Sequence, residues 1–125
     1  MTYQNEGFNK ILDFGKLWSE KFGNLPLPLG LDVVRKDLGT ELAKKITKGL
    51  KESIKYGYEH KEESIPYSLQ FGRGLNSTLG ERFVKMYVSD LTIDMGERGK
   101  KGIETLFKLG AQKNLLQKIK NIDLV

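Results

Sequence analysis

The sequence predicts a helix-dominated α/β protein with two or three short strands, which we expect near the N-terminus. The 125 residues are 38% hydrophobic and 30% charged, a globular composition with room for one ordinary domain. After residue 37, apolar residues recur at helical spacing. The first 36 residues instead contain short apolar runs and two prolines, a pattern typical of extended segments.

The N-terminal elements are short. FNKILDFG (residues 8–15) predicts a strand that is closed by Gly15. KLWSEKFG (residues 16–23) predicts one or two helical turns that end at Gly23, the usual residue after a helix. A second strand is predicted at residues 31–34, where Leu and Val predominate.

The run LPLPLG (residues 25–30) is apolar but has prolines at two alternate positions, Pro26 and Pro28. Proline has no backbone N–H and a fixed φ, so it is excluded from central strands. Taken alone, the run predicts an edge strand or a loop that packs on the core.

Four or so helices are predicted after residue 37. The first long helix has apolar residues at every fourth position, with Asp37 or Thr40 as its N-cap: Leu38, Leu42, Ile46, Leu50, Ile54 and Tyr58. A break follows at residues 59–61, and Pro66 is expected in the first turn of the next helix. Asn76 or Ser77 is expected to cap a third helix, and the last helix to break near Gly110 before a frayed tail.

One or two strands cannot satisfy their own backbone groups, and two-stranded ribbons are marginal in water. We therefore expect a sheet whose other strands are not in this sequence. The apolar faces of the strands and of the first long helix should then be more exposed than in an ordinary monomer.

Composition excludes several chemistries. The chain has no cysteine, which excludes a thiolate metal site and a cysteine nucleophile, and it has no P-loop, GxGxxG or HExxH motif. We assign no metal site, no cofactor and no catalytic residue. The lone His60 is expected to be a solvent-exposed cap or turn residue, and Asp90 and Asp94 to be capping or surface residues. The net charge of +5 is interpreted as solvated helix faces, without a nucleic-acid-binding motif. No apolar run can span a membrane, and a cytoplasmic location is expected.

Several motifs occur together in one order. They are TY…ILDFG, LPLPLG, RKDLG, ESIKYGYEHKEESIPYSLQFGRGL and RFVKMYVSDLTIDMGERG. In this order and spacing they resemble the C-terminal part of the 1,4-dihydroxy-6-naphthoate synthases, enzymes of the futalosine pathway to menaquinone. The resemblance extends over nearly the whole chain.

The resemblance implies the C-terminal portion of a two-lobed, periplasmic-binding-protein-like (type II) fold. Residues 1–24 would end the second lobe, residues 25–36 would cross back, and residues 37–125 would form the helical part of the first lobe. LPLPLG would then be the crossing segment near the ligand cleft. The substrate-binding residues expected on this basis are Tyr3, Leu27, Pro28, Leu29 and Gly30.

The resemblance also implies a lyase reaction in which cyclic dehypoxanthinyl futalosine is split by proton abstraction and elimination. The family's presumed base is a histidine just ahead of the segment that matches Met1–Tyr3, so this chain is expected to be inactive alone. It would bind that substrate only when completed by an N-terminal portion, which either a separate complementing chain or an upstream part of the same reading frame would supply. The alternative is a self-associating small-molecule-binding module without catalysis, in which open strand edges pair between copies.

Overall fold

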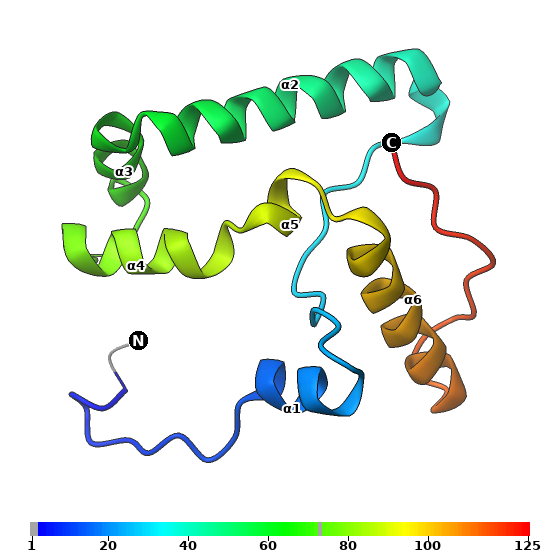
Figure 1. The fold of residues 1–125 in the computed structure, drawn as a ribbon, viewed down its shortest axis with the longest axis horizontal. Coiled ribbons are helices and arrows are strands. Elements are labelled where there is room, and N and C mark those ends of the chain that lie inside the picture. Colours follow the sequence, from blue (N-terminus) through cyan, green and yellow to red (C-terminus); the bar gives the residue numbers. More distant parts are fainter. Residues whose placement is uncertain (1–2, 73) are drawn as a thin grey trace. The chain divides into compact units, whose positions relative to one another are not determined.

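All regular elements in the described part of the chain are helical. The structure is a computed structural model that describes residues 3–72 and 74–125 (Figure 1). In chain order the elements are α1 (Phe14–Lys21), the 3-10 helix η1 (Lys36–Leu38), α2 (Thr40–Glu59), α3 (Lys61–Leu69), α4 (Ser77–Tyr87), α5 (Asp90–Ile93) and α6 (Gly96–Gln112). The helix-dominated character is confirmed.

The predicted short strands are not confirmed, since the described residues contain none. Residues 8–13 and 31–34 lie outside any helix and have no strand partner. Phe14 and Gly15, predicted as the end of the first strand, instead begin α1. The reason is Asp13, whose side chain accepts a hydrogen bond from the Lys16 N–H at 3.0 Å and so starts a helix.

The chain divides into two compact units. One contains the residues up to Asp32 together with Met95–Leu124, and the other contains Val33–Asp94. These units are not the predicted segments 1–24, 25–36 and 37–125, which concern the two lobes of a longer protein. That division stays a prediction.

In the second unit, α2 contacts η1, α3 and α5, and α3 contacts α4. The Tyr58 hydroxyl donates to the Val88 carbonyl at 2.6 Å, and the Ser64 hydroxyl donates to the Gly57 carbonyl at 2.7 Å. Both bonds tie the C-terminal half of α2 to its neighbours, which are visible in Figure 1. The predicted break after Glu59 is confirmed.

Only part of the predicted stripe on α2 packs inward, since its C-terminal residues Ile54 and Tyr58 are half-buried. Ala43 is buried and Tyr58 is half-buried, whereas Leu42, Ile46 and Leu50 each remain 44–45% exposed. The expected exposure of this helix is therefore confirmed. The predicted N-cap is wrong: Gly39, with φ 77°, precedes the helix and no side chain caps it.

Two local predictions in α3 and α4 have opposite outcomes. The Asn76 side chain accepts from the Leu79 N–H at 2.9 Å, so the predicted cap of α4 is confirmed. Pro66 lies in the interior of α3 and not in its first turn. Proline removes a single intrahelical donor, and the helix nevertheless continues to Leu69.

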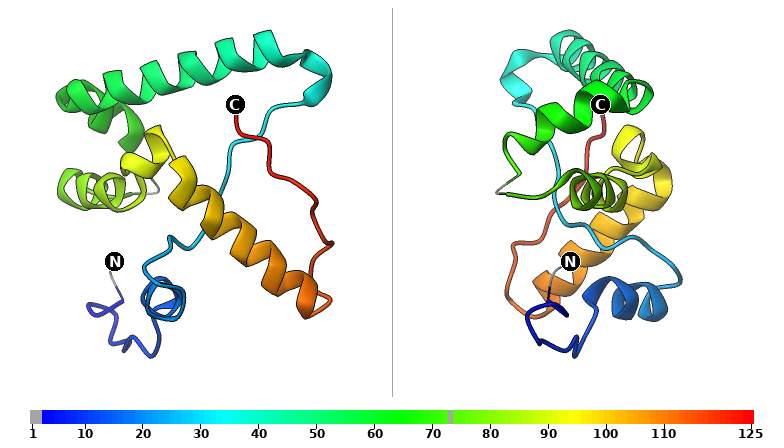
Figure 2. Two further views of the ribbon diagram at one scale, coloured as in Figure 1. Left: turned by 45° about the vertical axis from the view of Figure 1, so that its right-hand side comes forward. Right: turned by 90° about the vertical axis from the view of Figure 1, so that its left-hand side faces the viewer.

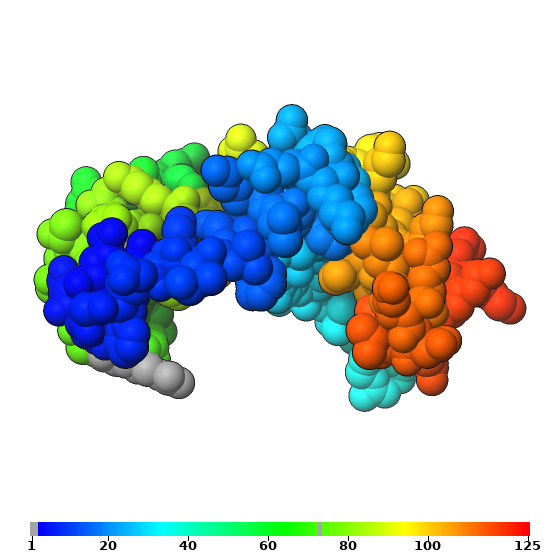
Figure 3. All heavy atoms as spheres, turned by 90° about the horizontal axis from the view of Figure 1, so that it is seen from below, coloured from blue at the N-terminus to red at the C-terminus, as the bar shows by residue number. Residues whose placement is uncertain are grey.

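In the first unit, α6 buries Gly99, Gly102 and Ile103. The helix continues through Gly110, where a break was predicted, and ends at Gln112. The following residues turn back along α6, as Figure 2 shows, and the end of the helix (orange) adjoins this tail (red) in Figure 3. Among the described residues, Ala43 and Ile103 are the apolar residues that are buried, so the core is small for the chain length.

Candidate functional site

The LPLPLG segment is held against α6. Both Nε and Nη2 of Arg98 donate to the Asn24 carbonyl, at 3.2 Å and 2.8 Å. The two residues are 74 positions apart in sequence, so this contact fixes the entry to the segment from a distant helix. A guanidinium suits this role because its donors form a rigid fork.

Pro26 lies directly on Gly102 of α6. A Cβ atom at position 102 would lie 2.7 Å from the Pro26 carbonyl oxygen and 3.4 Å from its Cγ, so only glycine fits without a shift. The segment thus packs on a helix and not in a sheet. An extended segment in this position needs no ladder donors, which explains why two prolines are tolerated.

The predicted substrate-binding residues differ in their exposure to solvent. Leu27 and Pro28 are half-buried, Leu29 is 75% exposed and Gly30 is exposed. Tyr3 is half-buried at the start of a turn, where its carbonyl accepts from the N–H groups of Glu6 and Phe8 at 3.2 Å and 2.9 Å. In the part of the chain that the structure describes, no hydrogen bond joins Tyr3 to residues 27–30. Their role in binding substrate stays a prediction.

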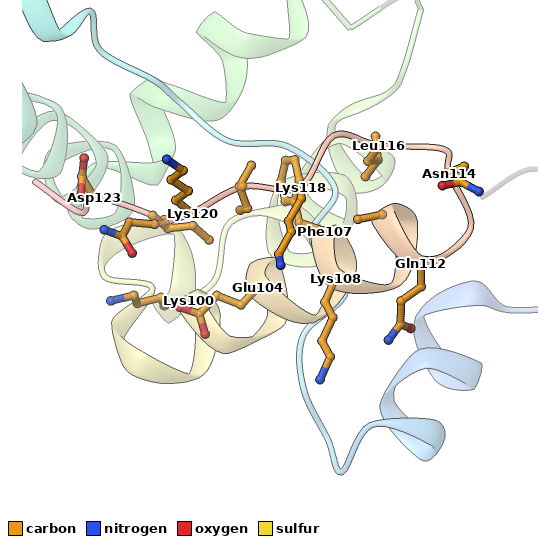
Figure 4. A pocket seen from close by; sticks show the side chains of 14 residues that line it. Lys100, Glu104, Phe107, Lys108, Gln112, Asn114, Leu116, Lys118, Lys120 and Asp123 are labelled. Carbon is orange, nitrogen blue, oxygen red and sulfur yellow. The ribbon is translucent and has the colours of Figure 1, made fainter.

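A cavity of about 950 Å³ lies between α6 and the tail, as Figure 4 shows. Its lining combines apolar side chains with four lysines and two carboxylates, an excess of two positive charges. The lining side chains that carry this character are Lys100, Glu104, Phe107, Lys108, Leu116, Lys118, Ile119, Lys120, Ile122 and Asp123.

None of the five predicted substrate-binding residues lines this cavity. Sequence analysis missed it because the tail was expected to fray. The available signal is the three-residue spacing of Leu116, Ile119 and Ile122, which places apolar side chains along the tail. Leu116 lies so close to Gly110 that a Cβ there would be 2.5 Å from the leucine Cδ1.

His60 closes α2 and precedes α3. Its Nδ1 lies 3.0 Å from the Tyr56 carbonyl oxygen, and its ring stacks on the Tyr56 ring with centroids 3.9 Å apart. The predicted cap or turn role is confirmed, although the residue is half-buried and not fully exposed.

The two acidic residues singled out in the sequence, Asp90 and Asp94, lie at the two ends of α5. Asp90 begins α5, and the Asp94 carboxylate lies 4.0 Å from Lys51 Nζ. In residues 3–72 and 74–125, no group of three or more metal-ligating side chains is present. The pKa of Asp13 is lowered, first by the hydrogen bond from the Lys16 N–H and then by the Lys10 side chain.

Comparison with known proteins identifies the family. A family model described as menaquinone biosynthesis matches residues 1–112. The chain belongs to this menaquinone-biosynthesis family. The match includes the LPLPLG segment and all of α6, and the whole tail (residues 113–125) lies beyond it.

Two curated relatives support the same assignment within the menaquinone-biosynthesis family. The chain is 30% identical to a 1,4-dihydroxy-6-naphthoate synthase of Streptomyces coelicolor over 115 residues, 92% of this chain. It is 33% identical to the enzyme of that name in Thermus thermophilus over 106 residues, 85% of this chain. The resemblance inferred from the sequence motifs is confirmed.

The chain spans about two fifths of the length of these members of the menaquinone-biosynthesis family, 40% and 39% respectively. In the described ranges no helix is both long and apolar enough to cross a membrane. The cytoplasmic location stays a prediction.

Proposed function

We propose that this chain supplies the C-terminal part of a lyase that converts cyclic dehypoxanthinyl futalosine to 1,4-dihydroxy-6-naphthoate in menaquinone biosynthesis. The observation that carries the proposal is the family match over residues 1–112, together with two relatives named 1,4-dihydroxy-6-naphthoate synthase. Proton abstraction and elimination need a positioned base. Within this chain, His60 is engaged at a helix end, so we assign no catalytic residue here.

The chain contributes shape to the substrate cleft. Residues 27–30 follow Pro26, which packs on Gly102 of α6. Within them Leu29 is exposed, so its apolar side chain can contact a flat aromatic product. Tyr3 borders the same cleft. The complete fold is two-lobed and periplasmic-binding-protein-like, with residues 25–36 as the crossing segment.

The small core supports the proposal that the chain is inactive without the remaining part of the fold. Few apolar side chains are buried, and the apolar side of α2 stays half exposed. A catalytic site needs its groups held on rigid supports to within a fraction of an ångström. A unit with so little core does not provide that rigidity alone.

The experiment is a fusion. The portion of the Thermus thermophilus relative that precedes its matched region is joined to Met1 of this chain, and turnover of cyclic dehypoxanthinyl futalosine is followed by product chromatography. We expect turnover by the fusion and none by the chain alone. A fusion that folds but gives no product, under conditions where the intact relative is active, would refute the proposal.

A variant of the fusion tests the cleft. Leu29→Asp places a charge where an apolar contact is proposed, and we expect KM to rise at least about tenfold. Leu31→Asp is the matched control, since Leu31 is also an exposed leucine but lies outside the predicted substrate-binding residues. Equal effects of the two substitutions would contradict the assignment of Leu29 to the cleft.

A second candidate is a self-associating small-molecule-binding module without catalysis. The half-exposed apolar side of α2 favours it, because such surfaces promote pairing between copies. Light scattering on the purified chain distinguishes the candidates: a monodisperse monomer would remove the second one.

A further inference from the structure

The N-terminal half of α2 has an apolar side that the described residues leave half exposed. Leu42, Ile46 and Leu50 are spaced four positions apart, so they lie on one side of the helix. Gly49 belongs to the same side because it follows Ile46 by three positions and Leu42 by seven. We call these four residues the open face of α2.

The other sides of α2 are accounted for within the chain. The packed side of α2 adjoins the open face: Ala43, three positions before Ile46 and seven before Leu50, is buried, and Tyr58 is half-buried. Lys48 and Lys55, on the side opposite the open face, are exposed and charged, as expected for a solvated surface. An apolar side that is neither packed nor polar is typical of a surface that another polypeptide covers.

Gly49 provides a second, independent indication. A glycine inside a helix is unfavourable relative to alanine by about 1 kcal/mol, and close approach of another backbone is one reason to place it there. In this chain a Cβ at position 49 would meet no atom within 4 Å. By contrast, Gly102 of α6 is required by the Pro26 carbonyl oxygen. Within its own unit, Val33–Asp94, the glycine on the open face has no close neighbour, and a closely packed partner backbone would account for it.

We infer that the open face of α2 is the docking surface for the part of the family protein that this chain does not contain. The inference rests on the proposed function. Because the chain spans 39–40% of its curated relatives, most of their length is available to provide the apolar surface that covers Leu42, Ile46 and Leu50. A backbone segment of that part packs against Gly49.

The experiment measures binding between two separate polypeptides. One is the full chain, and the other is the portion of the Thermus thermophilus relative that precedes its matched region. Titration calorimetry compares the unaltered chain with the double variant Leu42→Ser/Ile46→Ser, with Gly49→Ala, and with Lys55→Ala as the control. We expect Kd to rise at least about tenfold for the double variant and severalfold for Gly49→Ala, and to change less than about twofold for the control.

Circular dichroism separates lost docking from lost folding. Gly49→Ala adds a good helix former in open space, so the variant should be at least as helical as the unaltered chain. Weaker binding by a fully helical Gly49→Ala variant supports the docking surface.

Three outcomes would overturn the inference. They are equal affinity for the unaltered chain and both open-face variants, no binding by the unaltered chain, and light scattering that shows a dimer of the unaltered chain but a monomer of the Leu42→Ser/Ile46→Ser variant. The fusion experiment does not depend on affinity between separate chains, so failure of the docking surface and failure of the proposed function are distinguishable.

Discussion

Two helix-interior glycines should respond to alanine in opposite ways. At Gly102, an added Cβ would lie 2.7 Å from the Pro26 carbonyl oxygen, a backbone atom that cannot rotate away. At Gly49, the same Cβ would meet no atom within 4 Å. The two substitutions are chemically identical and both improve helix propensity, so the difference between them isolates the contact with Pro26.

The expected magnitudes follow from two competing effects. Replacing an interior glycine by alanine stabilises a helix by about 1 kcal/mol. Forcing an extra methyl group into a filled position costs about 1–3 kcal/mol, and the rigid carbonyl favours the upper part of that range. We therefore expect Gly49→Ala to stabilise its unit by about 1 kcal/mol and Gly102→Ala to destabilise its unit by about 1 kcal/mol.

The assay is urea unfolding followed by two signals. Trp18 is the single tryptophan and lies in α1, in the same unit as α6, so its fluorescence reports on that unit. Far-ultraviolet circular dichroism reports on both units, and separate transitions are analysed separately. Equal stabilisation by both substitutions would refute the packing of the LPLPLG segment on α6.

Three further substitutions test local contacts. Asn76→Ala removes the side chain that caps α4, and it should lower the free energy of unfolding of that unit by about 1 kcal/mol in urea melts; Asn76→Asp should restore it. Tyr58→Phe removes the half-buried hydroxyl that donates to the Val88 carbonyl at 2.6 Å, and it should cost about 0.5–1.5 kcal/mol, while no loss in a urea melt would contradict that bond. The pKa of Asp13 is lowered in the folded chain, so the ionised carboxylate stabilises α1 as its cap. This stabilisation is complete at pH values above the ordinary pKa of 3.8, and it is lost as the pH falls through the lowered pKa. A carboxyl chemical shift that titrates at or above 3.8 would contradict this prediction.

Local signals in the sequence had mixed success. Asn76 and Gly23 mark helix ends correctly because capping and left-handed termination depend on residues within one turn. Asp13 was overlooked as a cap, and the strand predicted across Phe14 failed for that reason. Short apolar runs fit a strand or a helix equally well, and the nearest capping group decides between them.

The candidate site was predictable only in part. The LPLPLG segment drew attention because prolines at alternate positions cannot belong to a central strand. Its packing against Gly102 could not be predicted, because nothing in the sequence around a glycine or a proline indicates a contact with a residue more than 70 positions away. The cavity beside α6 was missed because the tail was expected to fray, although Leu116, Ile119 and Ile122 of the tail line it together with residues of α6.

The sequence by itself determined the family, the helix-dominated character and the apolar period of α2. These properties depend on residue order and on spacings of three or four positions, which any short segment contains. The tertiary structure alone decided which side of α2 packs inward, where the proline segment packs and how the tail and α6 form a half-open cavity. Those features arise from contacts between segments distant in sequence, where small rotations of a helix change which side chains are buried.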